Sequence, residues 1–218
     1  MDNKFIKIGI QVVLIALAIF LGYKLYSGIM EPIEFNKEKE KRFNATINNL
    51  KDIRKIQASY KDVKGDYADS FEKLISFVKT DVFPIVRNIG TVPEELIDSI
   101  GYQEAELIAL EKGLIERDTS MIPILDSLFS KDYNIDSLRY VPYAENKIEF
   151  KIAAGKFKTM SGVIVPVFEA SVTNDILLHG LNKQLLINLN DEKLQMNHFP
   201  GLKVGDVNAA NNNAGNWE

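Results

Sequence analysis

The hydrophobic residues of the chain form one continuous run near its start and a periodic stripe after it. The run, Ile8–Tyr23, holds sixteen residues without a charge, and a lysine bounds it on each side. A helix needs about 20 apolar residues to cross a bilayer, and apolar neighbours extend the run to that length. The pattern therefore predicts one membrane-spanning helix, with residues 1–29 as a transmembrane anchor.

A cleaved signal peptide is the alternative interpretation of this run, because it also joins a basic start to a short apolar segment. Small residues are needed at the cleavage site, and residues 26–28 (Tyr-Ser-Gly) fit poorly, so we favour a retained anchor. The basic residues leave its orientation open. Lys4 and Lys7 precede the run, whereas the basic cluster at 37–42 that follows it is interleaved with glutamates.

Four small residues within the run would let a second spanning helix approach closely. They are Gly9, Ala16, Ala18 and Gly22. Such residues are also ordinary in spanning helices that have no partner. We expect helix packing at these positions, with other membrane-spanning subunits and the lipid bilayer as the partners of the anchor.

An amphipathic, basic helix is expected over about Glu34–Tyr60, because apolar residues recur there at steps of three and four. The stripe consists of Phe43, Ile47, Leu50, Ile53, Ile56 and Tyr60. It predicts a helical stem over residues 30–66 that packs on the protein's own body or on a partner helix, the first being commoner. Pro32 has no backbone N–H, so we expect it to kink or interrupt the helix.

The residues after the stem predict short helices. Gly65 suits the C-terminal cap of the stem, and residues 69–72 (Asp-Ser-Phe-Glu) suit a capping box that opens a helix. The apolar face of that helix would be Phe71, Leu74, Ile75 and Val78. No element is expected across Phe83–Pro84. Two further short helices are expected at 93–100 and 103–114.

From Leu138 onward, apolar and polar residues alternate with the period of half-buried strands. We expect a strand around Ile148–Ile152, a β-hairpin with its turn at Ser161-Gly162, and another strand at Gln184–Leu189. Pro166 predicts an edge position or a bulge. These patterns give an α+β head over residues 67–204, with an antiparallel sheet of about four strands.

The last fourteen residues, 205–218, are rich in Asn and Gly, which predicts an irregular tail. Trp217, the only tryptophan, is a candidate anchor onto the protein's own body or onto a partner. Oxygen ligands for Ca²⁺ would be offered by Asp206, Asn208, Asn211 and Asn213. Their spacing is not that of an EF-hand, so we expect no calcium site.

Charge is distributed unevenly along a chain whose net charge is −4. Residues 36–64 hold nine Lys/Arg and four Asp/Glu, whereas residues 65–218 hold fourteen Lys/Arg and twenty-three Asp/Glu. The basic stem could contact anionic lipid headgroups or an acidic partner, although a solvated helix face is the commoner role. The acidic head disfavours binding to nucleic acid.

The residue types that carry out catalysis are not arranged for it in this sequence. There is no cysteine, and the two histidines, His179 and His198, stand far apart without matching carboxylates. Neither a phosphate-binding glycine loop nor a nucleophile elbow is present. We therefore expect no enzyme, no metal and no cofactor.

The order of predicted elements resembles that of type IV pilins and type II secretion pseudopilins. The local match is residues 53–67, ending in Gly-Asp-Tyr, and residues 70–74 (Ser-Phe-Glu-Lys-Leu). In that family the long helix ends in an aromatic…Gly-x-Tyr turn, and a small helix packs a leucine against it. The resemblance covers about residues 5–80. It lacks the prepilin leader, and Gln11 is the only strongly polar residue where the family has a buried glutamate.

The resemblance implies a pilin-like fold and a non-enzymatic, single-pass subunit of an envelope machine for secretion, export or pilus-like assembly. It places the chain in the bacterial inner membrane with its C-terminal head in the periplasm. Two alternatives stay open. One is a membrane-tethered module that binds a peptide, lipoprotein or glycan, and the other is a bitopic assembly-platform protein with a ferredoxin-like domain.

Overall fold

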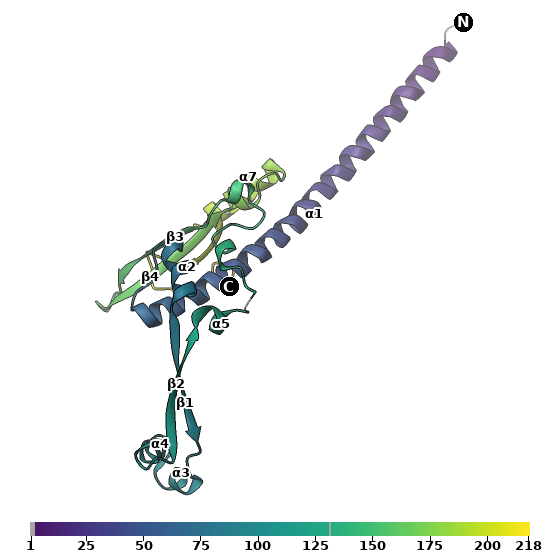
Figure 1. Ribbon diagram of the computed structural model, residues 1–218. Coiled ribbons are helices and arrows are strands. Elements are labelled where there is room, and N and C mark those ends of the chain that lie inside the picture. The colour runs from purple at the N-terminus through teal and green to yellow at the C-terminus, as the bar shows by residue number, and fades with distance from the viewer. Residues whose placement is uncertain (1–2, 131) are drawn as a thin grey trace. The chain divides into compact units, whose positions relative to one another are not determined.

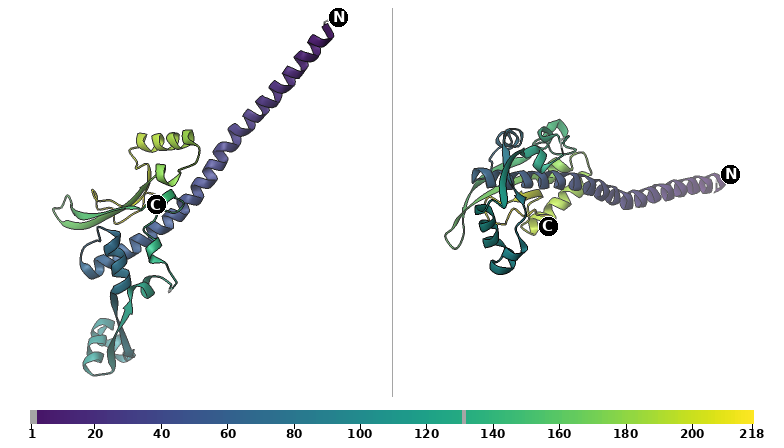
Figure 2. Two further views of the ribbon diagram at one scale, coloured as in Figure 1. Left: turned by 45° about the horizontal axis from the view of Figure 1, so that its top comes forward. Right: turned by 60° about the horizontal axis from the view of Figure 1, so that its bottom comes forward.

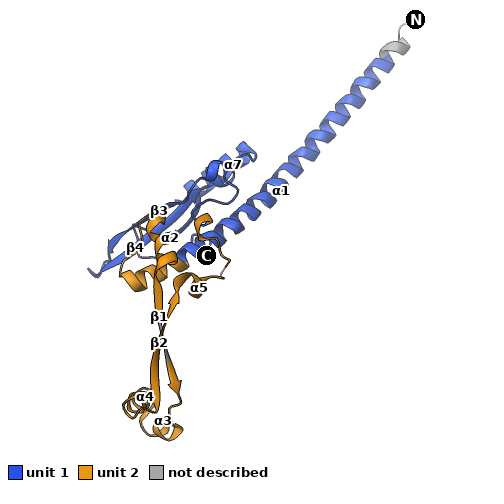
Figure 3. Cartoon of the chain, in the orientation of Figure 1, with its two compact units in different colours: residues 1–54, 138–218 blue, residues 55–137 orange. Residues whose placement is uncertain are grey.

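The chain folds into an α+β structure with a long N-terminal helix and two small antiparallel sheets (Figure 1). The computed structural model describes residues 3–130 and 132–218, with the side chains of all of these except residues 3–6, 84–87 and 119. Two compact units are present (Figure 3). Unit 1 consists of residues 1–54 and 138–218, and unit 2 of residues 55–137.

Helix α1, Asn3–Lys64, contains both the predicted anchor and the predicted stem. Both views in Figure 2 show it as one continuous helix. Of the kink or interruption expected at Pro32, the interruption is wrong, because the helix runs through this residue. Proline removes one hydrogen bond to the carbonyl four residues earlier, here Gly28. Gly28 is exposed, so water can satisfy that carbonyl, and the helical turns on both sides are kept.

The end of α1 confirms the predicted cap. Gly65 has φ of 86°, and its N–H donates to the Lys61 carbonyl at 2.8 Å. Helix α2, Phe71–Thr80, follows and buries the predicted apolar face together with Phe77. The capping box is wrong, since the N-cap is Ser70 and its side chain makes no cap bond. The helix starts one residue later than predicted, which puts Lys73 in place of a glutamate at the third helical position.

Unit 2 is built around a two-stranded ribbon that sequence patterns did not predict. Strands β1, Val82–Gly90, and β2, Ile115–Pro123, pair antiparallel along all nine residues. Pro84 is tolerated because each strand of a two-stranded ribbon has a free edge where no N–H is needed. The remaining elements are α3 (Glu94–Ile100), α4 (Tyr102–Glu111), α5 (Ile124–Leu128) and the 3₁₀ turn Ile135–Ser137. Helices α3 and α4 confirm the two predicted short helices.

Unit 1 holds a three-stranded antiparallel sheet of order β3-β4-β5. Its strands are β3 (Lys151–Lys158), β4 (Ile164–Thr173) and β5 (Gly201–Gly205). The predicted hairpin is confirmed, with Gly162 at φ of 84° in its turn. Strand β4 is central, but β5 pairs only with its Glu169–Thr173 part. Pro166 pairs with β3 alone, so it occupies a local edge as expected.

The strand predicted at Gln184–Leu189 is wrong. These residues belong to helix α7, Lys183–Gln195, which follows helix α6 (Asn174–Leu177). The Asn182 carboxamide caps α7 by accepting from the N–H groups of Gln184 and Leu185. This N-cap stabilises the start of the helix. Residues 184–189 also lack the strict apolar–polar alternation of a strand, so the helix is favoured. The separate strand expected around Ile148–Ile152 is also wrong, because its end and the first strand of the hairpin form one strand, β3. The sheet therefore has three strands, and the third, β5, is too short to detect between its two glycines.

The C-terminal tail is irregular, as predicted, but it is held against β5. Asn216 donates from its N–H to the Lys203 carbonyl and accepts the Lys203 N–H on its carboxamide oxygen, each at 3.0 Å. Its carboxamide nitrogen donates to the Gly201 carbonyl at 2.9 Å. The tail thereby covers the outer edge of β5. Trp217 packs on Gly215 of the tail itself, where an added Cβ would lie 2.4 Å from the indole ring.

Two of the side chains considered for Ca²⁺ accept hydrogen bonds within the protein: Asp206, and Asn211 from the Asn213 N–H at 3.1 Å. The Asp206 carboxylate accepts from the Lys203 ammonium at 2.7 Å and from the Asn208 N–H at 2.8 Å. Burial alone would raise the pKa of Asp206, but these two donors and the charge of Lys203 outweigh it and lower the pKa. Asp206 therefore stabilises the fold while it is ionised.

Replacing Asp206 with Asn should lower the stability of unit 1 by about 0.2–1 kcal/mol at pH 6, as expected for a partly exposed ion pair. The difference from the parent should be fully present above about pH 4, the range in which the unfolded carboxyl is ionised, and should be lost as the pH falls further through the lowered pKa of the native carboxyl. The difference in stability is measured by thermal unfolding in mild detergent, followed by Trp217 fluorescence. Asp191→Asn on the exposed surface of α7 is the control. A pH-independent difference for Asp206→Asn would contradict the assignment.

Candidate functional site

The first half of α1 presents apolar side chains to its surroundings on every side. The large apolar residues between Ile8 and Leu21 are 50–69% exposed. Burying one leucine-sized side chain is worth about 1.5–3 kcal/mol, so such a surface strongly favours an apolar environment. Among the described residues, α1 is the one helix long and apolar enough to cross a membrane.

The continuous helix separates the four small residues of the span into two pairs. At 100° per residue, Gly9 and Ala16 lie on one side, and Ala18 and Gly22 lie on the opposite side. The second side also carries Gln11, seven and eleven residues before Ala18 and Gly22. A Cβ added at Gly9 or Gly22 would meet no atom within 4 Å. Helix packing at these positions stays a prediction.

The apolar stripe of the stem is buried progressively along α1. Leu50, Ile53 and Ile56 are fully buried within the chain. Phe43, Ile47 and Tyr60 are half-buried, and the Tyr60 ring meets Phe77 edge-on at 4.9 Å between centroids. The stripe is thus occupied mainly by the protein's own residues, which leaves the opposite side of the stem for other contacts.

Arg42 fastens the stem to helix α6 within unit 1. Its Nη1 donates to the carbonyls of Leu177 and His179 at 3.1 and 2.9 Å, and its Nε donates to Glu38 at 3.1 Å. The Leu177 carbonyl is the last of α6, where a cation is favoured, and the His179 carbonyl follows it by two residues. The Arg42 guanidinium lowers the pKa of the Glu38 carboxyl through this hydrogen bond.

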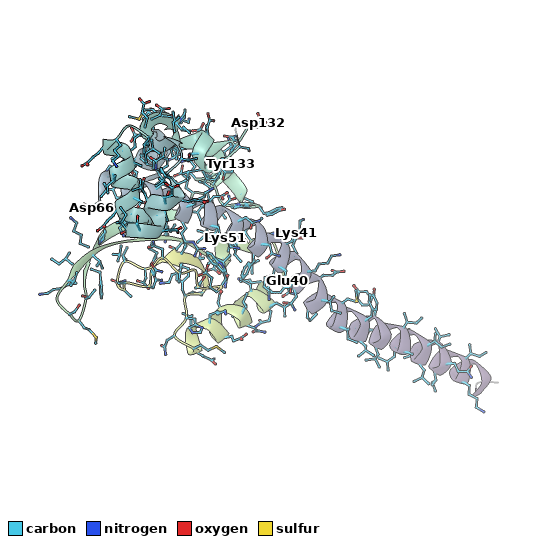
Figure 4. All side chains as sticks on the ribbon, turned by 90° about the horizontal axis from the view of Figure 1, so that it is seen from below. Glu40, Lys41, Lys51, Asp66, Asp132 and Tyr133 are labelled. Atoms are coloured by element: carbon cyan, nitrogen blue, oxygen red, sulfur yellow. The ribbon has the colours of Figure 1, made fainter. Side chains whose placement is uncertain are left out.

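The outward side of the stem is basic, which sequence reasoning found only as a charge count. Six exposed residues recur at alternating steps of four and three and so share one side of α1. We call this set the basic face: Lys37, Lys41, Asn44, Asn48, Lys51 and Lys55. It extends about 27 Å along the helix. Figure 4 shows its members Lys41 and Lys51, and the neighbouring Glu40, on α1.

Three of the four lysines of the basic face interact with described residues of the protein. The pKa of the Glu218 carboxyl is lowered by the hydrogen bond from Arg54 and, to a smaller extent, by the charge of the Lys51 ammonium. The Lys41 ammonium lies 3.6 Å from Glu38 and 5.0 Å from the centre of the Tyr143 ring. The Lys55 ammonium donates to the Leu128 carbonyl and lies over the Phe129 ring. Lys37 and Lys51 are exposed. The face can therefore offer positive charge to carboxylates or phosphates outside the protein.

A hollow of about 480 Å³ lies beside the start of the stem in unit 1. It is lined by Glu31, Glu34, Phe35, Lys37, Glu38 and Gly180–Asn182. The Asn182 carboxamide donates to Glu31 at 3.1 Å across it. The described residues contain no group of three or more His, Asp or Glu side chains that could hold a metal ion.

The two histidines are separate surface residues. His179 Nδ1 lies 3.3 Å from Glu145, and both side chains are largely exposed. His198 is exposed after the end of α7. The structure does not bring them together.

No known protein family, curated protein or solved structure matches this chain. The pilin-like identity suggested by residues 53–74 therefore stays a prediction.

Proposed function

We propose that this chain is a non-enzymatic, single-pass membrane subunit of an envelope machine for secretion, export or pilus-like assembly. The observation that supports it best is the continuity of α1, in which an exposed apolar segment passes without a break into a partly buried stem. A helix of this kind ties a protein body rigidly to a membrane. It suits a subunit that works through contacts.

The stem would act as a spacer for unit 1. At 1.5 Å per residue, Arg54 lies about 42 Å along the helix from Tyr26. Residues 138–218 of unit 1 are fixed to this stretch by Arg42 and by Arg54, whose guanidinium bonds Glu218 at 2.7 Å. The contact surfaces of unit 1 would therefore stand at a set height above the bilayer.

The span would pack on another membrane subunit through the side that carries Gln11, Ala18 and Gly22. A carboxamide in hydrocarbon needs a hydrogen-bond partner, and small residues let a neighbouring helix approach it. The pilin resemblance adds the bacterial inner membrane, with the C-terminal part in the periplasm. The test is a reporter that is active only in the cytoplasm, fused after Glu218. Activity of this fusion would exclude the periplasmic orientation.

Replacing Leu17 with Arg should remove the chain from the membrane. An arginine at the centre of a span costs about 2.5–3.5 kcal/mol, whereas leucine is favourable there, so the equilibrium constant for insertion should fall at least about 100-fold. The measurement is the fraction of full-length chain that stays with membranes after an alkaline carbonate wash.

Leu17→Ile is the matched control and should stay with the membranes like the parent. If the parent chain itself appears in the wash, the anchor and the proposed function are both wrong. If Leu17→Arg stays fully membrane-bound, α1 is not the segment that holds the chain there.

A membrane-tethered binding module is the second candidate function, favoured by the hollow beside Glu31 and Asn182. Its position at the start of the stem would put a bound group next to the bilayer. The platform-protein alternative receives no such support, because a ferredoxin-like domain has a four-stranded sheet and the sheets of the described residues have two and three strands.

A further inference from the structure

The β1–β2 ribbon of unit 2 is an arm that carries α3 and α4 at its end (Figures 1 and 3). Its nine paired residues reach about 30 Å. A two-stranded ribbon is only marginally stable alone. Large apolar side chains are nevertheless exposed along it, at Val82, Ile89 and Met121. Met121 pairs with Pro84, two residues from Val82, so Val82 and Met121 share one face of the ribbon, and Ile89 lies on the other face near the arm's end.

We define the arm tip as residues 94–114. Its helix α4 buries small residues and exposes a large one. Ala105 and Ala109 are the buried residues of α4. Leu107, between them in sequence, is 58% exposed. A helix that served only to cover its own ribbon would bury the leucine and expose the alanines. The reversed order leaves Leu107 available for a partner.

The charge of the arm tip defines that partner. Residues 94–114 hold six Asp/Glu and one Lys. Glu106 is engaged by Asn88 at 2.6 Å and Arg117 at 3.4 Å. Glu104 and Glu111 are exposed, and they lie one turn on either side of Leu107 on the outer side of α4. A matching surface would offer cations about two helical turns apart, with apolar atoms between them.

We propose that the arm tip of one copy of this chain docks on the basic face of α1 of a second copy. Lys41 and Lys51 stand about 15 Å apart along the helix, and their flexible ammonium groups can reach Glu104 and Glu111, whose Cα atoms are about 10 Å apart. The aliphatic stems of these lysines would cover Leu107. Asn44 and Asn48 between them are short enough to allow close approach.

This inference rests on the proposed function, because copies held in one membrane meet at a high local concentration and weak exposed charge pairs then suffice. Every copy carries both surfaces, and the two surfaces differ. The contact is therefore heterologous and can repeat from copy to copy along the membrane.

The experiment uses two full-length, differently tagged copies in the same membrane. One carries Leu107→Cys and the other Asn44→Cys, and each then has a single cysteine because the parent has none. Mild oxidation should give a disulfide-linked species with both tags. Its yield should fall at least tenfold at 1 M salt, where charges are screened within about 3 Å.

A charge swap tests the contact further. Glu104→Lys with Glu111→Lys in the first copy should abolish the two-tag species. Lys41→Glu with Lys51→Glu in the second copy should restore it, which also shows that the changed chains are folded. Ser99→Cys on the far helix of the tip is the matched control and should crosslink at least tenfold less.

Three results would each overturn the inference. They are absence of the two-tag species, failure of the charge swap to restore it, and crosslinking of Leu107→Cys to a different protein. The carbonate wash on the same membranes separates the two proposals. A chain that stays membrane-bound without the crosslink disproves only the docking, whereas a chain released by the wash disproves the proposed function.

Discussion

Replacing Phe168 with alanine should lower the free energy of unfolding of unit 1 by about 3–5 kcal/mol. Phe168 is fully buried in β4, the central strand of the sheet, opposite Ala154 of β3. Alanine would leave a cavity that the surrounding backbone cannot close. Trp217, the only tryptophan, belongs to unit 1. Its fluorescence during denaturant unfolding of the full chain in mild detergent would measure the change.

The hairpin tip of the same sheet provides the control. Met160 is fully exposed beside the turn, with a relative accessibility of 105%. Met160→Ala should therefore change the stability by less than about 0.5 kcal/mol. Phe168→Leu should lie between the two, because it keeps most of the buried volume. Equal effects of Phe168→Ala and Met160→Ala would show that β4 is not the centre of the core.

Local patterns predicted the elements whose signals lie within one turn or one hairpin. The stem, its cap at Gly65, helix α2 and the turn at Gly162 follow from spacing and from glycine at positive φ. Strand β1 was missed because Pro84 was taken as a breaker, which holds for central strands only. Whether a strand is central depends on pairing with residues distant in sequence, and the chain pattern does not contain that information.

The same limit applies to the candidate site. The excess of basic residues in the stem is visible in the sequence, and the three-and-four spacing of Lys37 to Lys55 could have been found as the complement of the apolar stripe. Only the fold shows that the protein's own residues cover the apolar stripe, and that the basic face is therefore left outward. The arm tip could not be predicted, because Leu107 reads as an ordinary core residue until Ala105 and Ala109 are seen to be the buried ones.

The turn after the stem depends on one buried polar side chain that sequence patterns did not single out. Gln57 is fully buried, and its carboxamide nitrogen donates to the Ala68 carbonyl at 2.7 Å. The Ala68 N–H donates back to the Gln57 carboxamide oxygen at 2.9 Å. One side chain thus satisfies both backbone groups of Ala68, as a neighbouring strand would. The pair fixes the path of the chain between α1 and α2.

Replacing Gln57 with alanine should destabilise this turn by about 2–6 kcal/mol. It leaves a buried N–H and a buried carbonyl without partners, and each such group costs about 1–3 kcal/mol. Hydrogen exchange of the Ala68 amide in the full chain is the direct measurement, since that amide loses its acceptor. At about 1.4 kcal/mol per factor of ten, its exchange should become at least about 30-fold faster.

Ser59→Ala is the matched control two residues along the same helix. The Ser59 hydroxyl donates only to the Lys55 carbonyl one turn earlier, a bond that adds little to a helix that already uses that carbonyl. Ala68 exchange should then stay within about threefold of the parent. Gln57→Glu separates the two bonds, because an ionised glutamate still accepts from the Ala68 N–H but cannot donate to the Ala68 carbonyl, and it places a charge at a fully buried position. It should therefore destabilise at least as much as alanine, and unchanged exchange at Ala68 in either Gln57 variant would show that the turn is held by other contacts.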